Sequence, residues 1–287
     1  MTSAVSIEAL TKSYGKLEAV RGISFEIGSG EVFGLLGPNG AGKTTTVEIL
    51  EGYRKRDGGT VRVLGEDPER AGTEWRQRIG VVLQSSAVYT TLTVREMLAL
   101  FAGYYRKPRP VDEVIELVGL MEKRNTRIKS LSGGQARRLD LGLALVGDPE
   151  LIFLDEPTTG FDPGARRAAW ATIRALRSLG KTILLTTHYL EEAEQLSDRV
   201  AVLREGRIVA HGRPADLMGR SRGAEIRYLR DGEEVVVKTD EPTRTLHELT
   251  AQALDAGVEL EGLEVRRPTL EDVYLSLTEQ DDETVLS

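Results

Sequence analysis

"VFGLLGPNGAGKTTTVEIL", residues 32–50, decides the fold of this chain. A short apolar run leads into a glycine-rich turn and then a helix-forming segment, and the turn satisfies the pattern G-x-x-x-x-G-K-[ST]. Such glycines let backbone N–H groups surround a phosphate, while Lys43 neutralises its oxygens and the Thr44 hydroxyl can bind Mg²⁺. The order strand, loop, helix therefore predicts a nucleotide-binding α/β core.

Other apolar runs indicate the remaining strands. They begin at Thr60, Ile79, Leu151, Thr182 and Val200. Several alternate with segments of helical period, which is the pattern of parallel strands covered on both faces. Between about residues 91 and 146 the strand signal gives way to three segments with apolar residues at three-and-four spacing, which predict an inserted helical subdomain.

The composition favours an intracellular protein with one large and one smaller domain. The chain has 287 residues with 40% hydrophobic content, enough for one large domain and a smaller one. It has no cysteine, which excludes a disulfide framework or a thiolate metal site and is typical of a reducing compartment. The start, "MTSAVSIEAL", has no signal-peptide pattern, and nowhere do 18 uncharged apolar residues run together. We therefore expect a chain that spans no membrane.

The charge is divided unevenly. The net charge is −7, but residues 1–220 carry 31 Lys and Arg against 28 Asp and Glu, whereas residues 221–287 carry 7 against 17. A slightly basic first part suits a nucleotide, and the overall acidity disfavours nucleic acid as a partner. From Gly223 the pattern predicts a hairpin around Asp231-Gly232, a helix over 242–257, a strand over 258–267 and a last helix over 268–280.

Polar residues follow three predicted strands at their carboxyl ends, where open α/β sheets bind ligands. "LIFLDE" ends in Asp155, which can support Mg²⁺, and Glu156, which can polarise the attacking water. The alternative is that this pair caps the turn "EPTTG". Gln84 closes "IGVVLQ" and could bind Mg²⁺ or orient water, and His188 ends "TILLTTH" and could donate to a γ-phosphate.

Two further segments suggest contacts to a nucleotide. Tyr14 precedes the phosphate loop in sequence and either stacks on adenine or packs in the core. "LSGGQ", residues 131–135, places Ser132, Gly133 and Gly134 at the start of a predicted helix, where the first N–H groups remain open to an anion. The chain thus has two anion-binding segments.

With "LSGGQ", the phosphate loop, Gln84, "LIFLDE" and His188 in this order, the chain resembles the nucleotide-binding domain of ATP-binding-cassette (ABC) transporters over about residues 4–217. The resemblance implies a P-loop NTPase core with an antiparallel β subdomain and the inserted helical subdomain. We therefore expect a nucleotide-binding domain over residues 4–220 and a small α+β accessory domain over residues 223–281. The resemblance also implies ATP and Mg²⁺ as ligands and a two-fold homodimer, in which each copy presents its "LSGGQ" to the ATP of the other.

The resemblance assigns roles to matching positions. Tyr14 would stack on adenine, Glu156 would be the general base, His188 would sense the γ-phosphate and Asp162 would bridge the dimer. Thr44 and Gln84 would bind Mg²⁺, and Asp155 would support the metal ion. The remaining nucleotide contacts would come from Gly37, Pro38, Asn39, Gly40, Ala41, Gly42, Lys43, Thr44, Thr45, Ser132, Gly133, Gly134 and Gln135. Two departures, Phe161 for the usual Leu and Ala136 for a basic residue or Gln, remove no functional group.

The C-terminal part of the sequence indicates which type of ABC transporter the chain resembles. "GRPADLM" followed by "RRPTLEDVYLSLTEQ" resembles the ending of bacterial drug and antibiotic exporter ATPases of the daunorubicin-resistance type. This implies separate permease subunits and a position at the cytoplasmic face of the cell membrane. The alternatives are the ATPase of an importer and a soluble ABC ATPase that acts on ribosomes or DNA. A GTPase is disfavoured because no "NKxD" stretch occurs, and a small-molecule kinase is disfavoured because it has no use for Ser132–Gly134.

Overall fold

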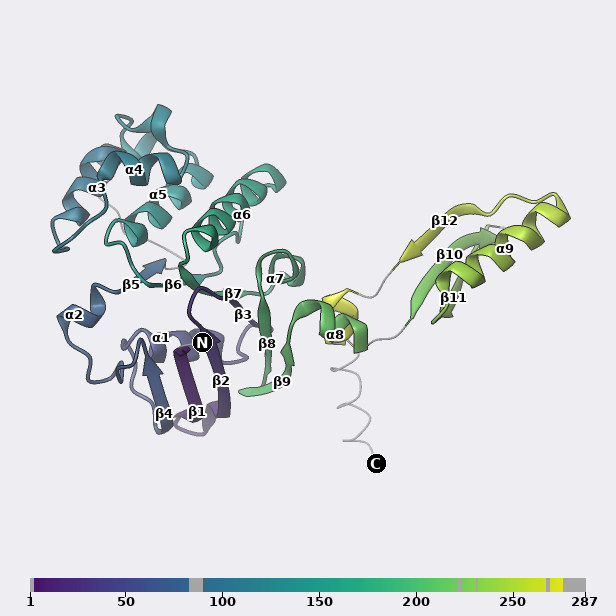
Figure 1. The fold of residues 1–287 in the computed structure, drawn as a ribbon, viewed down its shortest axis with the longest axis horizontal. Coiled ribbons are helices and arrows are strands. Elements are labelled where there is room, and N and C mark those ends of the chain that lie inside the picture. The colour runs from purple at the N-terminus through teal and green to yellow at the C-terminus, as the bar shows by residue number, and fades with distance from the viewer. Residues whose placement is uncertain (1–2, 83–89, 221–222, 231, 267–268, 276–287) are drawn as a thin grey trace. The chain divides into compact units, whose positions relative to one another are not determined.

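The computed structural model describes residues 3–82, 90–220, 223–230, 232–266 and 269–275. The chain forms two compact units, residues 1–211 (unit 1) and 212–287 (unit 2). The phosphate loop and all the other predicted site residues belong to unit 1. Figure 1 shows the ribbon of the chain with its helices and strands labelled.

Unit 1 contains a six-stranded sheet in the order β5-β6-β7-β3-β8-β9. The strands are β3 (Val32–Leu36), β5 (Ile79–Val82), β6 (Leu151–Asp155), β7 (Thr182–Thr187), β8 (Arg199–Arg204) and β9 (Arg207–Gly212). The pairs β5–β6, β6–β7, β7–β3 and β3–β8 are parallel. The parallel core predicted from the apolar runs is therefore confirmed, and its carboxyl edge carries the residues that follow β3, β6 and β7.

A second, antiparallel sheet has the order β2-β1-β4. Its strands are β1 (Ser3–Tyr14), β2 (Leu17–Gly28) and β4 (Gly58–Val63). The apolar run at Thr60 is thus a strand, but it pairs antiparallel with β1 and does not enter the parallel core. The sequence did not indicate β1 and β2, because register shifts interrupt their alternation of buried and exposed residues.

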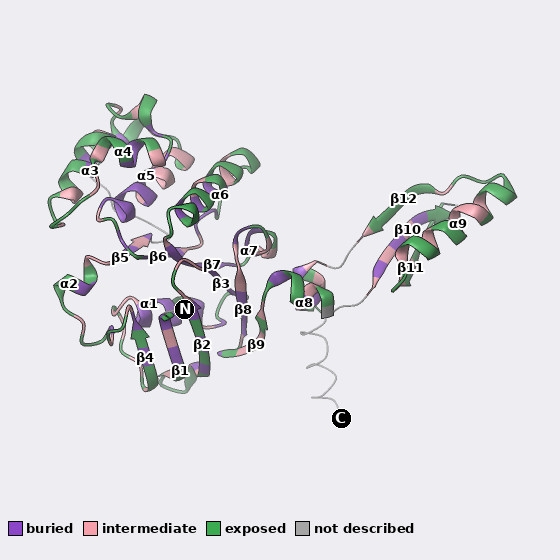
Figure 2. Cartoon of the chain, viewed as in Figure 1, coloured by how far each residue is buried: buried purple, intermediate pink, exposed green. Residues whose placement is uncertain are grey.

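Helices cover the parallel sheet, and two apolar clusters lie on its opposite faces. The helices around the sheet are α1 (Lys43–Leu50), α2 (Thr73–Arg76), α6 (Pro163–Ser178) and α7 (Leu190–Leu196). Along β6, Ile152 and Leu154 join a cluster with the inserted helices, whereas Leu151 and Phe153 join a cluster with the antiparallel sheet. Figure 2 shows these strands as the buried centre of unit 1.

The inserted helical subdomain consists of α3 (Val94–Ala102), α4 (Val111–Leu117), two 3₁₀ turns at Met121–Lys123 and Ile128–Ser130, and α5 (Gly133–Leu145). Its apolar residues pack against one face of the sheet, as the three-and-four spacing predicts. Gly80 of β5 permits this close approach, because a Cβ there would lie 2.5 Å from the Ala144 carbonyl oxygen of α5. Helix α5 therefore packs directly against the parallel sheet.

Unit 2 contains α8 (Pro214–Arg220), β10 (Ala224–Arg230), β11 (Glu233–Thr239), α9 (Pro242–Ala256) and β12 (Glu261–Arg266). The sheet order is β11-β10-β12, and β10 and β11 form the hairpin predicted around Gly232. Residues 270–275 are helical, and the rest of the predicted last helix lies outside the described residues. In neither unit is any described helix long and apolar enough to cross a membrane.

Candidate active site

The phosphate loop, residues 37–42, connects β3 to α1, and its backbone conformation requires glycine. Gly37, Gly40 and Gly42 have φ values of 149°, 82° and 102°. A Cβ at Gly37 would lie 2.3 Å from the Leu203 carbonyl oxygen, so no side chain fits there. A Cβ at Gly40, by contrast, would meet nothing within 4 Å, so the loop borders open space. Of the described side chains none caps α1, which keeps its first N–H groups oriented for an anion.

Lys43, the first residue of α1, has its side chain hydrogen-bonded to the backbone of this loop. Its Nζ donates to the Gly37 carbonyl at 2.7 Å and the Pro38 carbonyl at 3.1 Å, and the residue is buried. Burial lowers the pKa of Lys43, while the nearby Glu156 and Asp155 act in the opposite direction. An ammonium held by two neutral carbonyls beside open backbone N–H groups fits a phosphate, since the anion would compensate the charge that burial disfavours.

Asp155 and Glu156 lie at the end of β6, and Thr186 of β7 holds both. The Thr186 hydroxyl donates to Asp155 Oδ1 at 2.5 Å, and the Glu156 N–H donates to the hydroxyl and carbonyl oxygens of Thr186, both at 3.1 Å. Glu156 has a φ of 45°, in the left-handed region that a non-glycine residue rarely adopts. The chain therefore turns sharply at this carboxylate.

The Glu156 carboxylate contacts His188 at the carboxyl ends of β6 and β7. His188 Nδ1 lies 3.1 Å from Glu156 Oε1, and the Thr159 hydroxyl donates to Glu156 Oε2 at 3.1 Å. The Glu156 side chain is 12% exposed and that of His188 is 36% exposed, so the pair borders the surface. A carboxylate that a hydroxyl orients beside an imidazole is suited to accept a proton from water.

A magnesium site would draw on few protein oxygens. Among the described residues, no group of three or more His, Cys, Asp or Glu could hold a metal by itself. The candidates are Thr44, exposed at the start of α1, and Asp155, while Gln84 lies outside the described residues. Such a donor set fits Mg²⁺, which is commonly bound by one or two protein oxygens together with phosphate oxygens and water.

The "LSGGQ" segment begins α5 with a reciprocal cap. The Ser132 N–H donates to Gln135 Oε1 at 3.0 Å, and the Gln135 N–H donates to Ser132 Oγ at 3.3 Å. The first helical bond runs from Ala136 N–H to the Ser132 carbonyl, so the N–H groups of Gly133 and Gly134 precede the helix's own ladder. The cap orders this helix start and leaves those two glycine donors for an anion.

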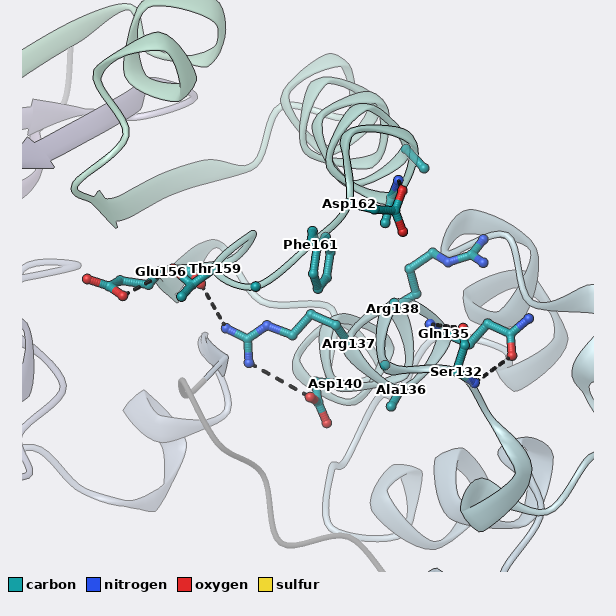
Figure 3. Close-up of a pocket in the computed structure, with 15 residues that line it drawn as sticks. Ser132, Gln135, Ala136, Arg137, Arg138, Asp140, Glu156, Thr159, Phe161 and Asp162 are labelled. Atoms are coloured by element: carbon teal, nitrogen blue, oxygen red, sulfur yellow. Dashed lines mark hydrogen bonds and ion pairs between the residues drawn. The ribbon is translucent and has the colours of Figure 1, made fainter. Parts of the chain in front are cut away.

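A cavity of about 610 Å³ lies in front of this helix start (Figure 3). It is lined by residues 132–138 and Asp140 at the start of α5, by Glu156, by residues 159–162 and by Ala165 and Ala168. The described residues that line it include none of residues 37–45. Within one chain, this cavity therefore joins the "LSGGQ" segment to Glu156 but not to the phosphate loop.

Asp162 has a local role that the sequence prediction missed. It is the N-cap of α6, and its Oδ1 accepts from the N–H groups of Gly164 at 2.8 Å and Ala165 at 2.9 Å. The signal was present, because an Asp directly before Pro at the first helical position is a typical helix start. The carboxylate nevertheless lines the cavity in front of Ser132, where a contact to a second chain remains a prediction.

Tyr14 ends β1 with a ring that is 39% exposed, so it does not pack in the core. Lys12 Nζ and Arg54 Cζ lie 5.6 Å and 5.2 Å from the ring centroid. Two cationic side chains thus lie close to the Tyr14 ring. The stacking of this ring on adenine remains a prediction.

The structure also reveals a buried carboxylate that the sequence did not indicate. Glu192 of α7 is fully buried, and its Oε1 accepts from the Thr158 hydroxyl at 2.8 Å and from Trp170 Nε1 at 3.0 Å. Glu192 and its two partners thus connect the helix after His188, the segment after Glu156 and helix α6. A single Glu among several acidic residues in "HYLEEAEQL" gives no sequence signal for this position.

These features define a nucleotide hydrolase of the P-loop class with a second anion-binding segment on an inserted helical subdomain. A family profile described as "ABC transporter" matches residues 20–159, and one described as "ABC transporter domain-containing protein-like, C-terminal domain" matches residues 213–269. The chain belongs to the ABC transporter family, as an ATP-binding subunit with ATPase activity.

Curated relatives match nearly the whole chain. The Nod factor export ATP-binding protein I of Rhizobium sp. (strain N33) is 41% identical over 294 residues, which cover 96% of this chain and 97% of that protein. A daunorubicin resistance ATP-binding protein of Streptomyces coeruleorubidus is 37% identical and covers 97% of both chains.

Solved structures share the fold. The ADP conformation of an ATP-binding cassette of an ABC transporter matches with a TM-score of 0.68 and 26% identity, over 75% of this chain and 93% of that one. A dimeric post-hydrolysis state of another ATP-binding cassette, bound to ADP and Pi, matches with a TM-score of 0.65 and 25% identity, over 73% of this chain and 98% of that one.

Proposed function

We propose that this chain is the ATP-hydrolysing subunit of a bacterial exporter and drives efflux of a drug, antibiotic or lipid-like molecule through separate permease subunits. Relatives named for Nod factor export and for daunorubicin resistance support export, because they match 96% and 97% of this chain and so include its C-terminal part. A subunit of this kind would lie at the cytoplasmic face of the membrane, held there by the permease.

The observation that carries the mechanism is the division of the site. The cavity at Ser132 is lined by Glu156 and Asp162 but by none of residues 37–45. A second copy related by a two-fold axis can present its "LSGGQ" segment to the nucleotide on the first copy's phosphate loop, and the symmetry completes two equivalent sites at once. We therefore assign a homodimer with two ATP between the copies.

Within each site, residues 37–45 hold the phosphates and Lys43 neutralises their charge. Tyr14 is assigned to adenine. Bound Mg²⁺ would neutralise the β- and γ-phosphate oxygens, and Thr44, Asp155 and Gln84 are the residues assigned to it. From the opposite copy, Ser132, Gly133, Gly134 and Gln135 face the γ-phosphate, and Asp162 bridges the two chains.

Hydrolysis is assigned to the pair at the end of β6 and β7. Glu156 accepts a proton from the attacking water, and the Thr159 hydroxyl, 3.1 Å from its Oε2, orients the carboxylate. His188 contacts Glu156 through Nδ1, which leaves its other ring nitrogen for the γ-phosphate. Closure of the dimer follows ATP binding and opening follows hydrolysis, because the γ-phosphate contacts exist only before hydrolysis.

The variant Glu156→Gln tests this assignment. It keeps the shape of the side chain but cannot take a proton, so turnover should fall by about 10²–10⁴ while ATP still binds. The dimer should then accumulate with ATP, as measured by light scattering after size exclusion. Glu116→Gln, which removes an exposed carboxylate from α4, is the control and should behave as the wild type. Normal hydrolysis by Glu156→Gln would remove Glu156 from the role of base.

The exporter assignment is tested with the membrane partner. The chain is expressed in a bacterial host with a candidate permease and purified from the membrane in detergent, and ATP turnover is measured with amphiphilic drugs and lipid-like compounds. We expect a stable complex whose turnover rises with one class of compound. A complex with ribosomes or DNA in place of a membrane protein would support the alternative of a soluble ABC ATPase.

A further inference from the structure

Arg137 links the helix that begins at Ser132 to the backbone around Glu156. It lies in α5, five residues after Ser132, and its guanidinium points to the turn that follows β6 (Figure 3). Nη2 donates to the Asp155 carbonyl at 2.9 Å and approaches the Glu156 carbonyl at 3.5 Å, while Nε donates to the Pro157 carbonyl at 3.4 Å. One side chain of the helical subdomain thus contacts three consecutive carbonyls of the core.

The turn that Arg137 contacts is conformationally costly. Glu156 has a φ of 45°, in a region where a non-glycine residue is strained. Thr186 holds the N–H side of Glu156, and Arg137 binds the carbonyls before, at and after it. These two residues together fix the peptide planes on both sides of the Glu156 Cα, and with them the direction in which the carboxylate leaves the chain.

The buried guanidinium of Arg137 depends on the carbonyls that it contacts. Its side chain is 13% exposed, and burial lowers its pKa, while Asp140 and Asp155 act in the opposite direction. Removing a guanidinium from water is unfavourable unless its N–H groups find acceptors, and a planar fork is the side chain that can serve several at once. The carbonyls of residues 155–157 provide such acceptors.

We propose that Arg137 is a positioning residue for hydrolysis, through which the helix that begins with "LSGGQ" holds the Glu156 carboxylate of the same chain in its working orientation. The inference rests on the proposed role of Glu156 as general base. Because Ser132 and Arg137 lie on one helix, a displacement of α5 is transmitted to the Glu156 turn.

Three variants test the proposal in the full-length chain. Arg137→Met keeps the aliphatic stem but loses all the donors, and Arg137→Lys keeps the charge but loses the planar fork. Arg109→Met is the matched control. Its guanidinium is similarly sheltered, at 19% exposure, and binds Asp148 and Glu113 without contacting the turn at Glu156.

Steady-state ATP turnover gives the first readout. Arg137→Met should lower kcat by about 10–100-fold and leave KM within about threefold of the wild-type value. A displaced base slows the chemical step but does not weaken ATP binding. Arg137→Lys should regain part of this loss, and Arg109→Met should stay within about twofold of the wild type. A kcat for both Arg137 variants equal to that of the wild type overturns the proposal, as does a change confined to KM.

A double-mutant cycle with Glu156→Gln, measured by single-turnover hydrolysis, excludes a merely structural role. If Arg137 acts through Glu156, the double variant should be no slower than Glu156→Gln alone, because residues that act as a unit are strongly non-additive. If the two losses multiply, Arg137 acts elsewhere and the proposal is wrong. Should Arg137→Met fail to fold, Arg137→Lys enters the same cycle and decides.

The same measurements separate this inference from the proposed function. A wild type that does not hydrolyse ATP contradicts the function itself, and Glu156→Gln with normal turnover contradicts the base on which both depend. Loss of turnover in Glu156→Gln with an unchanged kcat in both Arg137 variants contradicts only the inference.

Discussion

Glu51 makes the stability of unit 1 depend on pH. It follows α1 as the C-cap residue, and burial, together with the nearby Asp155 and Glu48, raises its pKa from the ordinary 4.5 to about 8. The C-terminal end of α1 adds to this effect, because the helix dipole is negative there. Glu51 therefore stays protonated in the folded state at neutral pH, whereas in the unfolded chain it ionises above pH 4.5.

The sign of the effect follows from proton binding. Between about pH 4.5 and pH 8 the folded state holds one proton more at Glu51 than the unfolded state, so the free energy of unfolding decreases as the pH rises through this window. At about 1.4 kcal/mol per pKa unit the full difference would be roughly 5 kcal/mol. Because Glu51 is only partly buried, we expect solvent screening to reduce this to about 2–3 kcal/mol.

Glu51→Gln replaces the carboxyl with a neutral group of the same shape. The variant should gain about 2–3 kcal/mol of stability relative to the wild type between pH 5 and pH 8.5. Urea unfolding followed by tryptophan fluorescence measures this in unit 1, because both tryptophans, Trp75 and Trp170, are buried there. Glu116→Gln is the control for loss of an exposed carboxylate and should shift stability by less than about 0.5 kcal/mol at every pH. A Glu51→Gln advantage that does not grow with pH would refute the reasoning.

Two further variants test the phosphate loop and the buried carboxylate. Lys43→Ala removes the ammonium beside the loop and should weaken ATP binding by about 100-fold or more, whereas Lys55→Ala, at an exposed position, should bind normally. Equilibrium titration with a fluorescent ATP analogue measures this, and wild-type affinity in Lys43→Ala would mean that the loop is wrongly assigned. Glu192→Ala leaves the Thr158 hydroxyl and Trp170 Nε1 without their acceptor and should lower stability by about 2–4 kcal/mol in urea unfolding. Glu192→Gln retains a carbonyl oxygen and should lose less, and equal losses in the two variants would show that these hydrogen bonds are not the cause.

The sequence predicted those parts of the fold and site that depend on local patterns. The glycines at 37, 40 and 42 have positive φ values, and this is the property for which a P-loop pattern selects. Glu156 and His188 meet, and Asp155 lies beside Thr186, because parallel strands bring their carboxyl ends to one edge of a sheet. The hairpin at Gly232 follows from the Asp-Gly pair between alternating runs.

Features that depend on distant partners could not be predicted. The run at Thr60 reads as a strand, but nothing local indicates that β4 pairs antiparallel with β1. Arg137 stands in "ARR" on a helix, where an arginine ordinarily faces water, and its partners are 18 to 20 positions further along the chain. Glu192 likewise looks like one more acidic residue on an exposed helix, and only packing against Trp170 shows that it is buried.

The separation of the "LSGGQ" cavity from the phosphate loop has a genetic consequence for the proposed dimer. Each copy contributes its "LSGGQ" segment to the ATP site of the other copy, so a substitution in one chain impairs hydrolysis on an unaltered chain. When altered and normal chains are expressed together and mix at random, most assemblies contain at least one altered copy. Substitutions at Ser132, which acts on the nucleotide of the other copy, would then be inherited as dominant-negative alleles, whereas a substitution that unfolds the chain, and so keeps it out of the assembly, would be recessive.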